Sequence, residues 1–221
     1  MKRGIPALLW LLRVSSAAQD APVPVEQEPS HKTVFQNDCV QAFRVHLEPG
    51  EATLMHTHSH DDAAVRLSEA MVTSDGPGQP AGAPQTAEAG FVSARDNSRA
   101  PLTHRVHNVG KTPFDVLDVQ ALRRPPGPQV EPISRAAAEN ASMRVYRYEL
   151  AAGASGERHT HTRPYLLVAA TDVNLRMTSP DGRSFEHLVK AGDMHWVDSE
   201  VTHTLVNAGT EKAVLVEIEL K

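Results

Sequence analysis

The sequence predicts an all-β protein built from two tandem barrels of the double-stranded, jelly-roll-like type. Short runs alternate apolar and polar residues, as where Phe43, Val45 and Leu47 are separated by polar neighbours. Turn dipeptides such as Asp75-Gly76 separate these runs, and no stretch sustains a long helical period. Several short motifs also occur twice in the same order, which indicates two copies of one unit.

The repeated motifs begin with a glycine followed by a His-Thr-His triplet. Gly50 precedes His56-Thr-His58 by the same interval at which Gly153 precedes His159-Thr-His161. Later motifs match in the same order, namely Met71 to Gly76 with Met177 to Gly182, and Thr103 to Gly110 with Thr202 to Gly209. This order indicates an internal duplication of about 90–100 residues, longer than the unit of a solenoid.

The repeat divides the 221 residues into two domains. We expect the first domain over residues 34–122, a Pro-rich linker over 123–132 and the second domain over 133–221. Residues 19–33 contain prolines and acids with few large apolar side chains, which is typical of a disordered lead-in.

The last strand of each copy predicts part of the core. Apolar residues alternate with other residues there, so we expect the apolar ones to point into their barrel. These residues are Leu117, Val119 and Ala121 in the first copy and Val216, Ile218 and Leu220 in the second.

The first 18 residues resemble a secretory signal peptide. Met1-Lys-Arg precedes a short apolar run, and the small residues Ser16 and Ala18 predict cleavage after Ala18. Export would make the protein periplasmic or secreted, and a frayed cytoplasmic tail is the alternative. The apolar run is too short to cross a bilayer, so no membrane span is predicted.

Net charge, cysteine content and histidine content indicate which kinds of ligand the protein can bind. A formal net charge of −5 provides no basic surface for nucleic acid. The lone Cys39 excludes an intramolecular disulfide and a cysteine-rich zinc site. Twelve histidines are many for this length. We therefore expect a small-molecule ligand or substrate, and a homo-oligomer is compatible with the sequence.

A metal site is predicted in the first copy. His56 and His58 are two residues apart, so both imidazoles project from one face of a strand. His104 could return from a distant strand as a third ligand, and Asp62, or Asp61 beside it, could add a carboxylate. Neutral imidazoles with a carboxylate suit a divalent transition metal.

The second copy offers His159, His161 and His203 at the corresponding positions. Tyr165 and Leu166 stand in the place of the carboxylate, so we expect a site with three nitrogens and open positions. Such a shell leaves the charge of the ion uncompensated, which predicts stronger binding of an anionic ligand here than in the first copy. The cations near this site in sequence are Arg158, Arg163 and Arg176.

At these residues the sequence resembles the cupin superfamily, and the two copies resemble a bicupin. The first cupin motif is a glycine, five residues, His-x-His and a glutamate three or four residues later, and both copies match it through the histidines. Both copies also match the His and Asn of the second motif. Asp198 and Glu200 replace its proline and glycine in copy two, and the interval from Gly90 is three residues too long in copy one.

The resemblance covers about Phe35 to Lys221 and implies two metal-binding barrels. Iron, manganese, zinc and nickel all remain candidates, because the motif glutamate is missing or replaced. Three functions stay open at this point. They are a metal-dependent enzyme, oxygenase- or isomerase-like, acting on a small polar or anionic molecule; a non-catalytic bicupin that binds or senses a ligand; and a structural barrel pair with vestigial sites.

Overall fold

The structure is a computed structural model that describes residues 21–128, 130–179, 181–198 and 200–221. The expected signal peptide, residues 1–18, lies outside the described residues. Nineteen strands and one 3-10 helix, η1 (Val25–Gln27), make up the regular structure of the described chain. No helix among these residues is long and apolar enough to span a membrane.

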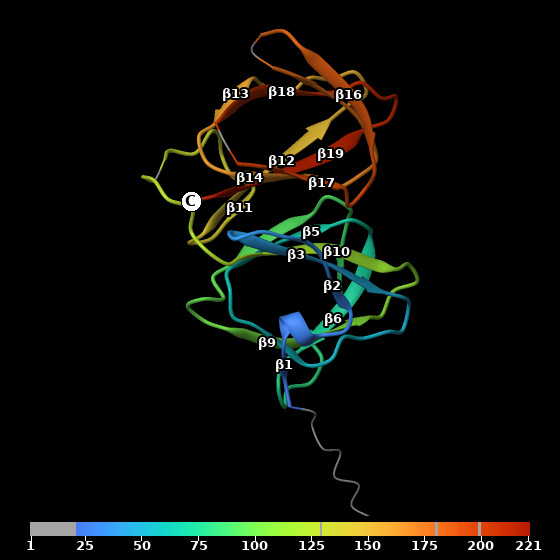
Figure 1. Cartoon of the computed structure of the whole chain (residues 1–221). Helices are drawn as coiled ribbons and strands as arrows, with labels where there is room; N and C mark the ends of the chain where they lie inside the picture. Colours follow the sequence, from blue (N-terminus) through green and yellow to red (C-terminus); the bar gives the residue numbers. More distant parts are fainter. Residues whose placement is uncertain (1–20, 129, 180, 199) are drawn as a thin grey trace, which may run out of the picture.

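Barrel 1 consists of two five-stranded sheets (Figure 1). Its strands are β1 (Val23–Pro24), β2 (His31–Gln36), β3 (Val40–Leu47), β4 (His56–His58), β5 (Asp62–Arg66), β6 (Ala70–Asp75), β7 (Gln85–Ala87), β8 (Val92–Arg95), β9 (Leu102–Asn108) and β10 (Phe114–Ala121). One sheet has the order β1-β4-β9-β6-β7, and the other has the order β2-β3-β10-β5-β8. The pairing of β1 with β4 is parallel.

Barrel 2 repeats this arrangement with sheets of five and four strands. Its strands are β11 (Ala138–Glu139), β12 (Met143–Leu150), β13 (His159–His161), β14 (Tyr165–Ala169), β15 (Val173–Thr178), β16 (Ser184–Val189), β17 (Met194–Val197), β18 (Val201–Asn207) and β19 (Ala213–Leu220). The sheet orders are β11-β12-β19-β14-β17 and β13-β18-β15-β16. The chain is therefore all-β, with two barrels in tandem, as the sequence predicts.

The same strand pair frames the site in each barrel. In barrel 1, His56 on β4 lies opposite His104 on β9 in an antiparallel register. In barrel 2, His159 on β13 lies opposite His203 on β18. Because residues directly opposite on adjacent strands share a face, this register brings the distant histidine beside the triplet.

The two barrels are stacked on each other (Figure 1), and the largest apolar cluster of the described residues takes its members from both. Leu117, Val119, Val216, Ile218 and Leu220 belong to it, with Ala121 packed against it. The expectation that these residues point into their own barrel is therefore wrong. Both faces of β10 and β19 are buried, so alternation distinguishes the two faces without showing which one lines the barrel.

The N-terminal segment differs from the disordered lead-in expected for residues 19–33, because residues 21–33 are part of barrel 1. β1 joins the edge of one sheet and β2 the edge of the other. Buried Glu28 accepts hydrogen bonds from the backbone N–H groups of Ser30, His31 and Leu54 at 2.8, 3.1 and 3.0 Å. β1 pairs with β4 farther along the chain and β2 pairs with the adjacent β3, and composition alone cannot reveal these pairings.

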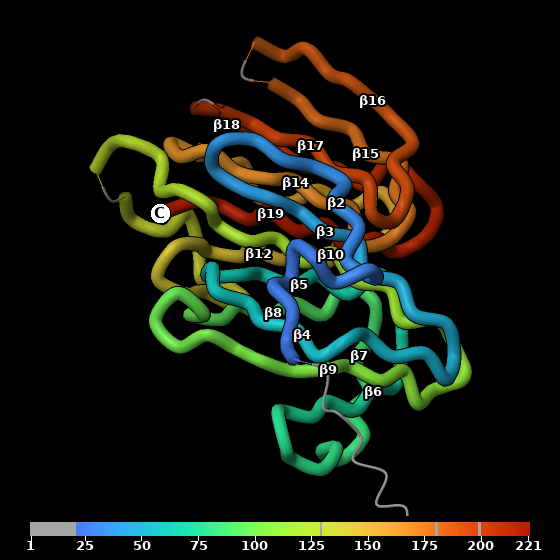
Figure 2. The backbone as a smooth tube through the Cα atoms, turned by 60° about the horizontal axis from the view of Figure 1, so that its bottom comes forward, coloured from blue at the N-terminus to red at the C-terminus, as the bar shows by residue number. Residues whose placement is uncertain are grey.

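The β2–β3 hairpin also reaches toward barrel 2 (Figure 2). The Phe35 ring stacks on Trp196 of β17 with ring centroids 6.1 Å apart. Asn140 donates hydrogen bonds to the carbonyl oxygens of Asp62 and Arg95 at 2.8 and 3.0 Å. The two barrels are thus joined by polar contacts as well as by the shared apolar cluster.

Candidate metal centre

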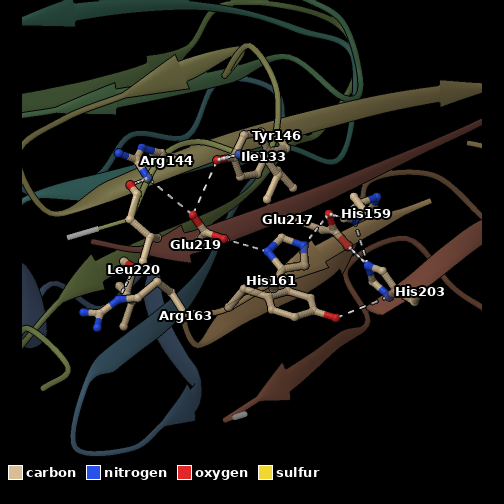
Figure 3. A network of polar contacts seen from close by, with 12 residues as sticks. Ile133, Arg144, Tyr146, His159, His161, Arg163, His203, Glu217, Glu219 and Leu220 are labelled. Carbon is tan, nitrogen blue, oxygen red and sulfur yellow. Dashed lines mark hydrogen bonds and ion pairs between the residues drawn. The ribbon is translucent and has the colours of Figure 1, made fainter. Parts of the chain in front are cut away.

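Three histidines and one glutamate converge inside barrel 2 (Figure 3). Glu217 Oε2 lies 3.1 Å from His159 Nε2 and 3.0 Å from His161 Nε2. Glu217 Oε1 lies 3.0 Å from His203 Nε2. One ligand atom from each residue lies within 4.8 Å of the other three. Three nitrogens and one carboxylate oxygen form a donor set that suits a divalent transition metal.

The second ring nitrogen of each histidine has a partner of its own. Metal-binding histidines usually direct this nitrogen to a carboxylate, a carbonyl or another polar group, which fixes the tautomer and the ring orientation. The Nδ1 partners are the Glu157 carbonyl for His159 at 3.0 Å, the Glu219 carboxylate for His161 at 2.7 Å and the Tyr165 hydroxyl for His203 at 3.4 Å. All three Nε2 atoms are left to face Glu217.

The charges of barrel 2 favour protonated histidines around an ionised Glu217, as the pKa shifts of these groups show. Burial would raise the pKa of Glu217, but hydrogen bonds from the three histidines hold it well below its usual range. Burial would lower the pKa of His161, but the carboxylates of Glu217 and Glu219 raise it to about 9. A metal ion must therefore displace protons from this centre, since protonated imidazole cannot act as a ligand.

Glu217 corrects the expectation of a second site without a carboxylate. Tyr165 does occupy the motif position, where its ring stacks on His161 with centroids 3.9 Å apart. β19 supplies the acid instead. The sequence carried a signal for this, because Glu217 and Glu219 interrupt an otherwise apolar strand, and a buried acid needs a partner.

Barrel 1 brings the three histidines of its predicted site together. His58 Nε2 lies 3.1 Å from His56 Nε2 and 3.3 Å from His104 Nε2. Burial is the main reason that the pKa values fall, to about 4 for His56, about 2 for His58 and about 3 for His104. Neutral imidazoles whose lone pairs face one another favour a cation between them.

Asp62 does not join these Nε2 atoms, contrary to its predicted role as the fourth ligand. Its Oδ2 lies 3.3 Å from His58 Nδ1, and Asp118 Oδ2 lies 3.5 Å from the same nitrogen. Asp62 begins β5, which belongs to the opposite sheet, so it approaches His58 from behind. Asp118 shares this position on the last strand with Glu217 of barrel 2, but its side chain is one methylene shorter.

The side chains of Asp62 and Asp118 are both buried. Burial and the neighbouring Asp118 raise the pKa of Asp62 to about 8, and burial raises the pKa of Asp118 to about 7. Asn97 donates a hydrogen bond to Asp62 at 2.6 Å. Asp61, the alternative acid, bonds to Ser98 and Ser142 instead. His58 Nδ1 and Asp118 Oδ2 have no hydrogen-bond partner among the described residues, and His58, Asp62 and Asp118 form a group of possible metal donors on the side of His58 away from His56 and His104.

A cavity of ≈ 680 Å³ with both polar and apolar lining opens at the histidines of barrel 1. Arg66 and Arg95 line it together with His56, His58 and His104. The Arg66 guanidinium lies 4.2 Å from the centroid of the Phe114 ring. Its buried Nη1 has no hydrogen-bond partner among the described residues. Positive charge therefore faces the space in front of the metal site.

The cavity of barrel 2 is smaller, ≈ 460 Å³, and mainly apolar. Its lining includes Leu167, Leu175, Met177 and Leu215, and His203 connects it to the metal centre. The cavity of barrel 2 thus suits an apolar group, whereas the cavity of barrel 1 suits a polar or anionic one.

The arginines expected to bind an anion in barrel 2 lie elsewhere. Arg163 is buried and donates hydrogen bonds to the linker carbonyls of Pro125 and Pro126 at 2.9 and 2.8 Å. Arg176 pairs with Glu186 at the surface, and Arg158 is exposed. The charges near the two sites thus differ from those expected, because Arg66 and Arg95 line the cavity of barrel 1 and Glu217 places a carboxylate in barrel 2.

Comparison with known proteins identifies the family. The model of the Cupin domain matches residues 146–219. The chain is 35% identical over 83 residues to the beta-alanine degradation protein BauB of Pseudomonas aeruginosa, which covers 38% of this chain and 86% of BauB. AerE from Microcystis aeruginosa has a similar fold, with a TM-score of 0.54 and 12% identity over 88% of this chain and 98% of AerE.

The oxalate decarboxylase of Bacillus subtilis, which is described with Mn(II) centres, also has a similar fold. Its TM-score is 0.52 at 14% identity, and the match covers 83% of this chain and 69% of the enzyme. At such identities these two structures support the fold alone. The domain match, the identity to BauB and the paired barrels agree, and the chain belongs to the cupin superfamily as a two-barrel member.

Proposed function

We propose that this chain is a metal-binding bicupin whose barrel 2 holds a divalent transition metal through His159, His161, His203 and Glu217. The observation that supports this is the single carboxylate of Glu217, which reaches all three Nε2 atoms within 3.1 Å. Imidazole and carboxylate together suit iron, manganese, nickel and zinc. Manganese belongs in the test because the similar oxalate decarboxylase is described with Mn(II) centres.

We further propose an enzyme that acts on a small molecule at this centre. A bound metal would supply a Lewis acid or redox centre. The protein itself contributes the surroundings: Leu167, Leu175 and Leu215 give the cavity an apolar lining, and Glu219 fixes the ring of His161. A non-catalytic binding or sensing role is the alternative, and turnover distinguishes the two.

In barrel 1 we propose a second divalent metal at His56, His58 and His104, together with a site for a small anionic molecule. The partnerless Nη1 of Arg66 supports the second part, because a buried cation without a partner is costly. A carboxylate entering the cavity would meet this guanidinium and the histidine cluster. Bidentate binding of carboxylates is a characteristic use of arginine.

Metal analysis of protein purified without a histidine tag tests the two metal sites. We expect His161→Ala to lose the metal of barrel 2 and His58→Ala to lose that of barrel 1. His46→Ala is the control, since the side chain of His46 is 50% exposed on β3. If the wild-type protein takes up no iron, manganese, nickel or zinc, the histidines are vestigial and the proposal is wrong.

Calorimetric titration with malonate tests the anion site. Arg66→Gln should weaken malonate binding at least about tenfold, because the loss of a buried charge-assisted hydrogen bond costs about 1.5–3 kcal/mol. Arg123→Gln is the matched control, since the side chain of Arg123 is 63% exposed. Equal affinities for the wild-type protein and Arg66→Gln would exclude this use of the cavity.

A further inference from the structure

We infer that the N-terminal segment supplies a fourth nitrogen ligand, His31, to the metal site of barrel 1. This inference rests on the metal site proposed above. His31 is the first residue of β2 and lies outside both copies of the repeated motifs. Its buried ring has its centroid 4.6 Å from that of His56 and 5.8 Å from that of His58. One ring nitrogen of each of the three lies within 4.8 Å of the others.

The orientation of His31 is fixed by Glu28. His31 Nδ1 lies 2.6 Å from Glu28 Oε2, so Nε2 is the nitrogen left to bind a metal. Glu28 is itself held by the backbone N–H groups that fix its carboxylate in a buried position. A buried carboxylate behind an imidazole is also found at Glu219 and His161 in barrel 2. Such a pair raises the basicity of the histidine as a ligand.

As at His31, the Nδ1 atom of each of the other three histidines of the barrel 1 site lies near a polar group. His56 Nδ1 donates to the Leu54 carbonyl at 2.8 Å, and His104 Nδ1 lies 3.2 Å from the Ser74 hydroxyl. His58 Nδ1 faces Asp62 at 3.3 Å. Each ring thus has its Nδ1 directed at a neighbouring polar group. The Nε2 atoms are left for a metal: His31, His56 and His58 form one group of possible donors, and His104 Nε2 lies 3.3 Å from His58 Nε2.

In barrel 2 a tyrosine ring, rather than an imidazole, packs against the first histidine of the site. Val45, which pairs with His31 across β2 and β3, lies five residues before Gly50. The residue five before Gly153 is Tyr148, and its ring stacks on His159 with centroids 5.6 Å apart. The small Val45 leaves room for an imidazole in barrel 1, whereas barrel 2 places a phenol against its first histidine.

The two barrels therefore differ in their donor sets. Barrel 1 offers imidazole nitrogens, which suit zinc, copper and nickel, and barrel 2 adds a carboxylate, which also suits manganese. A neutral shell leaves the charge of the ion for an anionic ligand, consistent with Arg66 and Arg95 in the cavity.

Metal titration of the full-length chain tests the inference. His31→Gln and Glu28→Gln are compared with His46→Ala as the control, and His58→Ala identifies which zinc ion belongs to barrel 1. Zinc affinity is measured by chelator competition, and the visible spectrum of bound Co²⁺ reports a change of ligands. We expect both variants to weaken the barrel 1 site about 10–100-fold and to alter its Co²⁺ spectrum, with barrel 2 unchanged.

Three outcomes separate the alternatives. If His31→Gln and Glu28→Gln leave affinity and spectrum unchanged while His58→Ala loses the ion, His31 is a packing residue and the inference is wrong. If no ion is lost in His58→Ala, the proposed metal site of barrel 1 is wrong as well. If His31→Gln does not fold, the Co²⁺ spectrum of Glu28→Gln decides, since that variant keeps the imidazole.

Discussion

Glu217 and Asp118 occupy corresponding positions on the last strands of the two barrels and differ by one methylene. Glu217 reaches three Nε2 atoms within 3.1 Å, whereas Asp118 comes no closer than 3.5 Å to the Nδ1 of His58. At the scale of a single residue, this difference places a carboxylate among the Nε2 atoms in barrel 2 but not in barrel 1.

Substitution of Glu217 should affect one centre and spare the other. We expect Glu217→Gln to weaken metal binding in barrel 2 at least about tenfold, because it removes the charged donor. Metal content and chelator competition measure the effect, and the exposed Glu211→Gln is the control. Full metal affinity in Glu217→Gln would show that the carboxylate is not a ligand.

At the scale of one element, β19 contributes both to the apolar cluster between the barrels and to the candidate metal centre of barrel 2. Val216, Ile218 and Leu220 face the apolar cluster between the barrels, and Glu217 and Glu219 point into barrel 2. A strand with both faces buried can combine a packing face with a ligand face because its side chains alternate.

Glu219→Gln tests how far the second acid of β19 matters. It keeps all four candidate donors but removes the charge that fixes His161, 2.7 Å away. We expect about 10–100-fold weaker metal binding in barrel 2 with an unchanged fold by circular dichroism. An affinity equal to that of the wild-type protein would make Glu219 a packing residue rather than a positioning one.

At the scale of the whole molecule, the barrels share their largest apolar cluster, so they should unfold together. Ile218→Ala removes buried atoms from that cluster and should cost about 2–5 kcal/mol of unfolding free energy. Scanning calorimetry should show one transition at a lower temperature. Two transitions, with only one shifted, would mean that the barrels are independent.

Asp61 links the two barrels by hydrogen bonds, and its ionisation makes the stability of the protein depend on pH. It accepts hydrogen bonds from Ser98 N at 2.9 Å and Ser98 Oγ at 2.5 Å in barrel 1, and from Ser142 Oγ at 2.6 Å in barrel 2. Burial would raise its pKa, but these donors lower it below its ordinary value. The stabilisation is therefore present above about pH 4 and is lost as the pH falls through the folded-state pKa.

Asp61→Ala should accordingly destabilise the protein by about 1–3 kcal/mol at pH 7, because it removes the charge-assisted hydrogen bonds from Ser98 and Ser142. Urea unfolding at pH 7 and at about pH 3 measures this, and the difference from the wild-type protein should shrink at the lower pH. Asp38→Ala is the control, because the side chain of Asp38 is 86% exposed. A constant difference at both pH values would contradict the assignment.

The sequence by itself determined the all-β class, the two barrels and the histidines that meet in each. Alternation and fixed spacing are local properties, and the matching of His56 with His104 and of His159 with His203 follows from motifs repeated in order. The other residues of the two candidate metal centres could not be predicted from alternation and motif spacing.

Only the tertiary structure decided which acids and which further histidine approach each centre. Glu217 lies on β19, whose pairing partners β12 and β14 are far away in the chain. His31 lies on β2, in the sheet opposite β4, so its approach to His56 depends on how the two sheets of barrel 1 face each other. Asp62 is turned away because β5 also belongs to the sheet opposite β4. Which face of β10 and β19 lines a barrel likewise depends on the packing of one barrel against the other. These are non-local contacts, and a local pattern cannot specify them when both faces of a strand are buried.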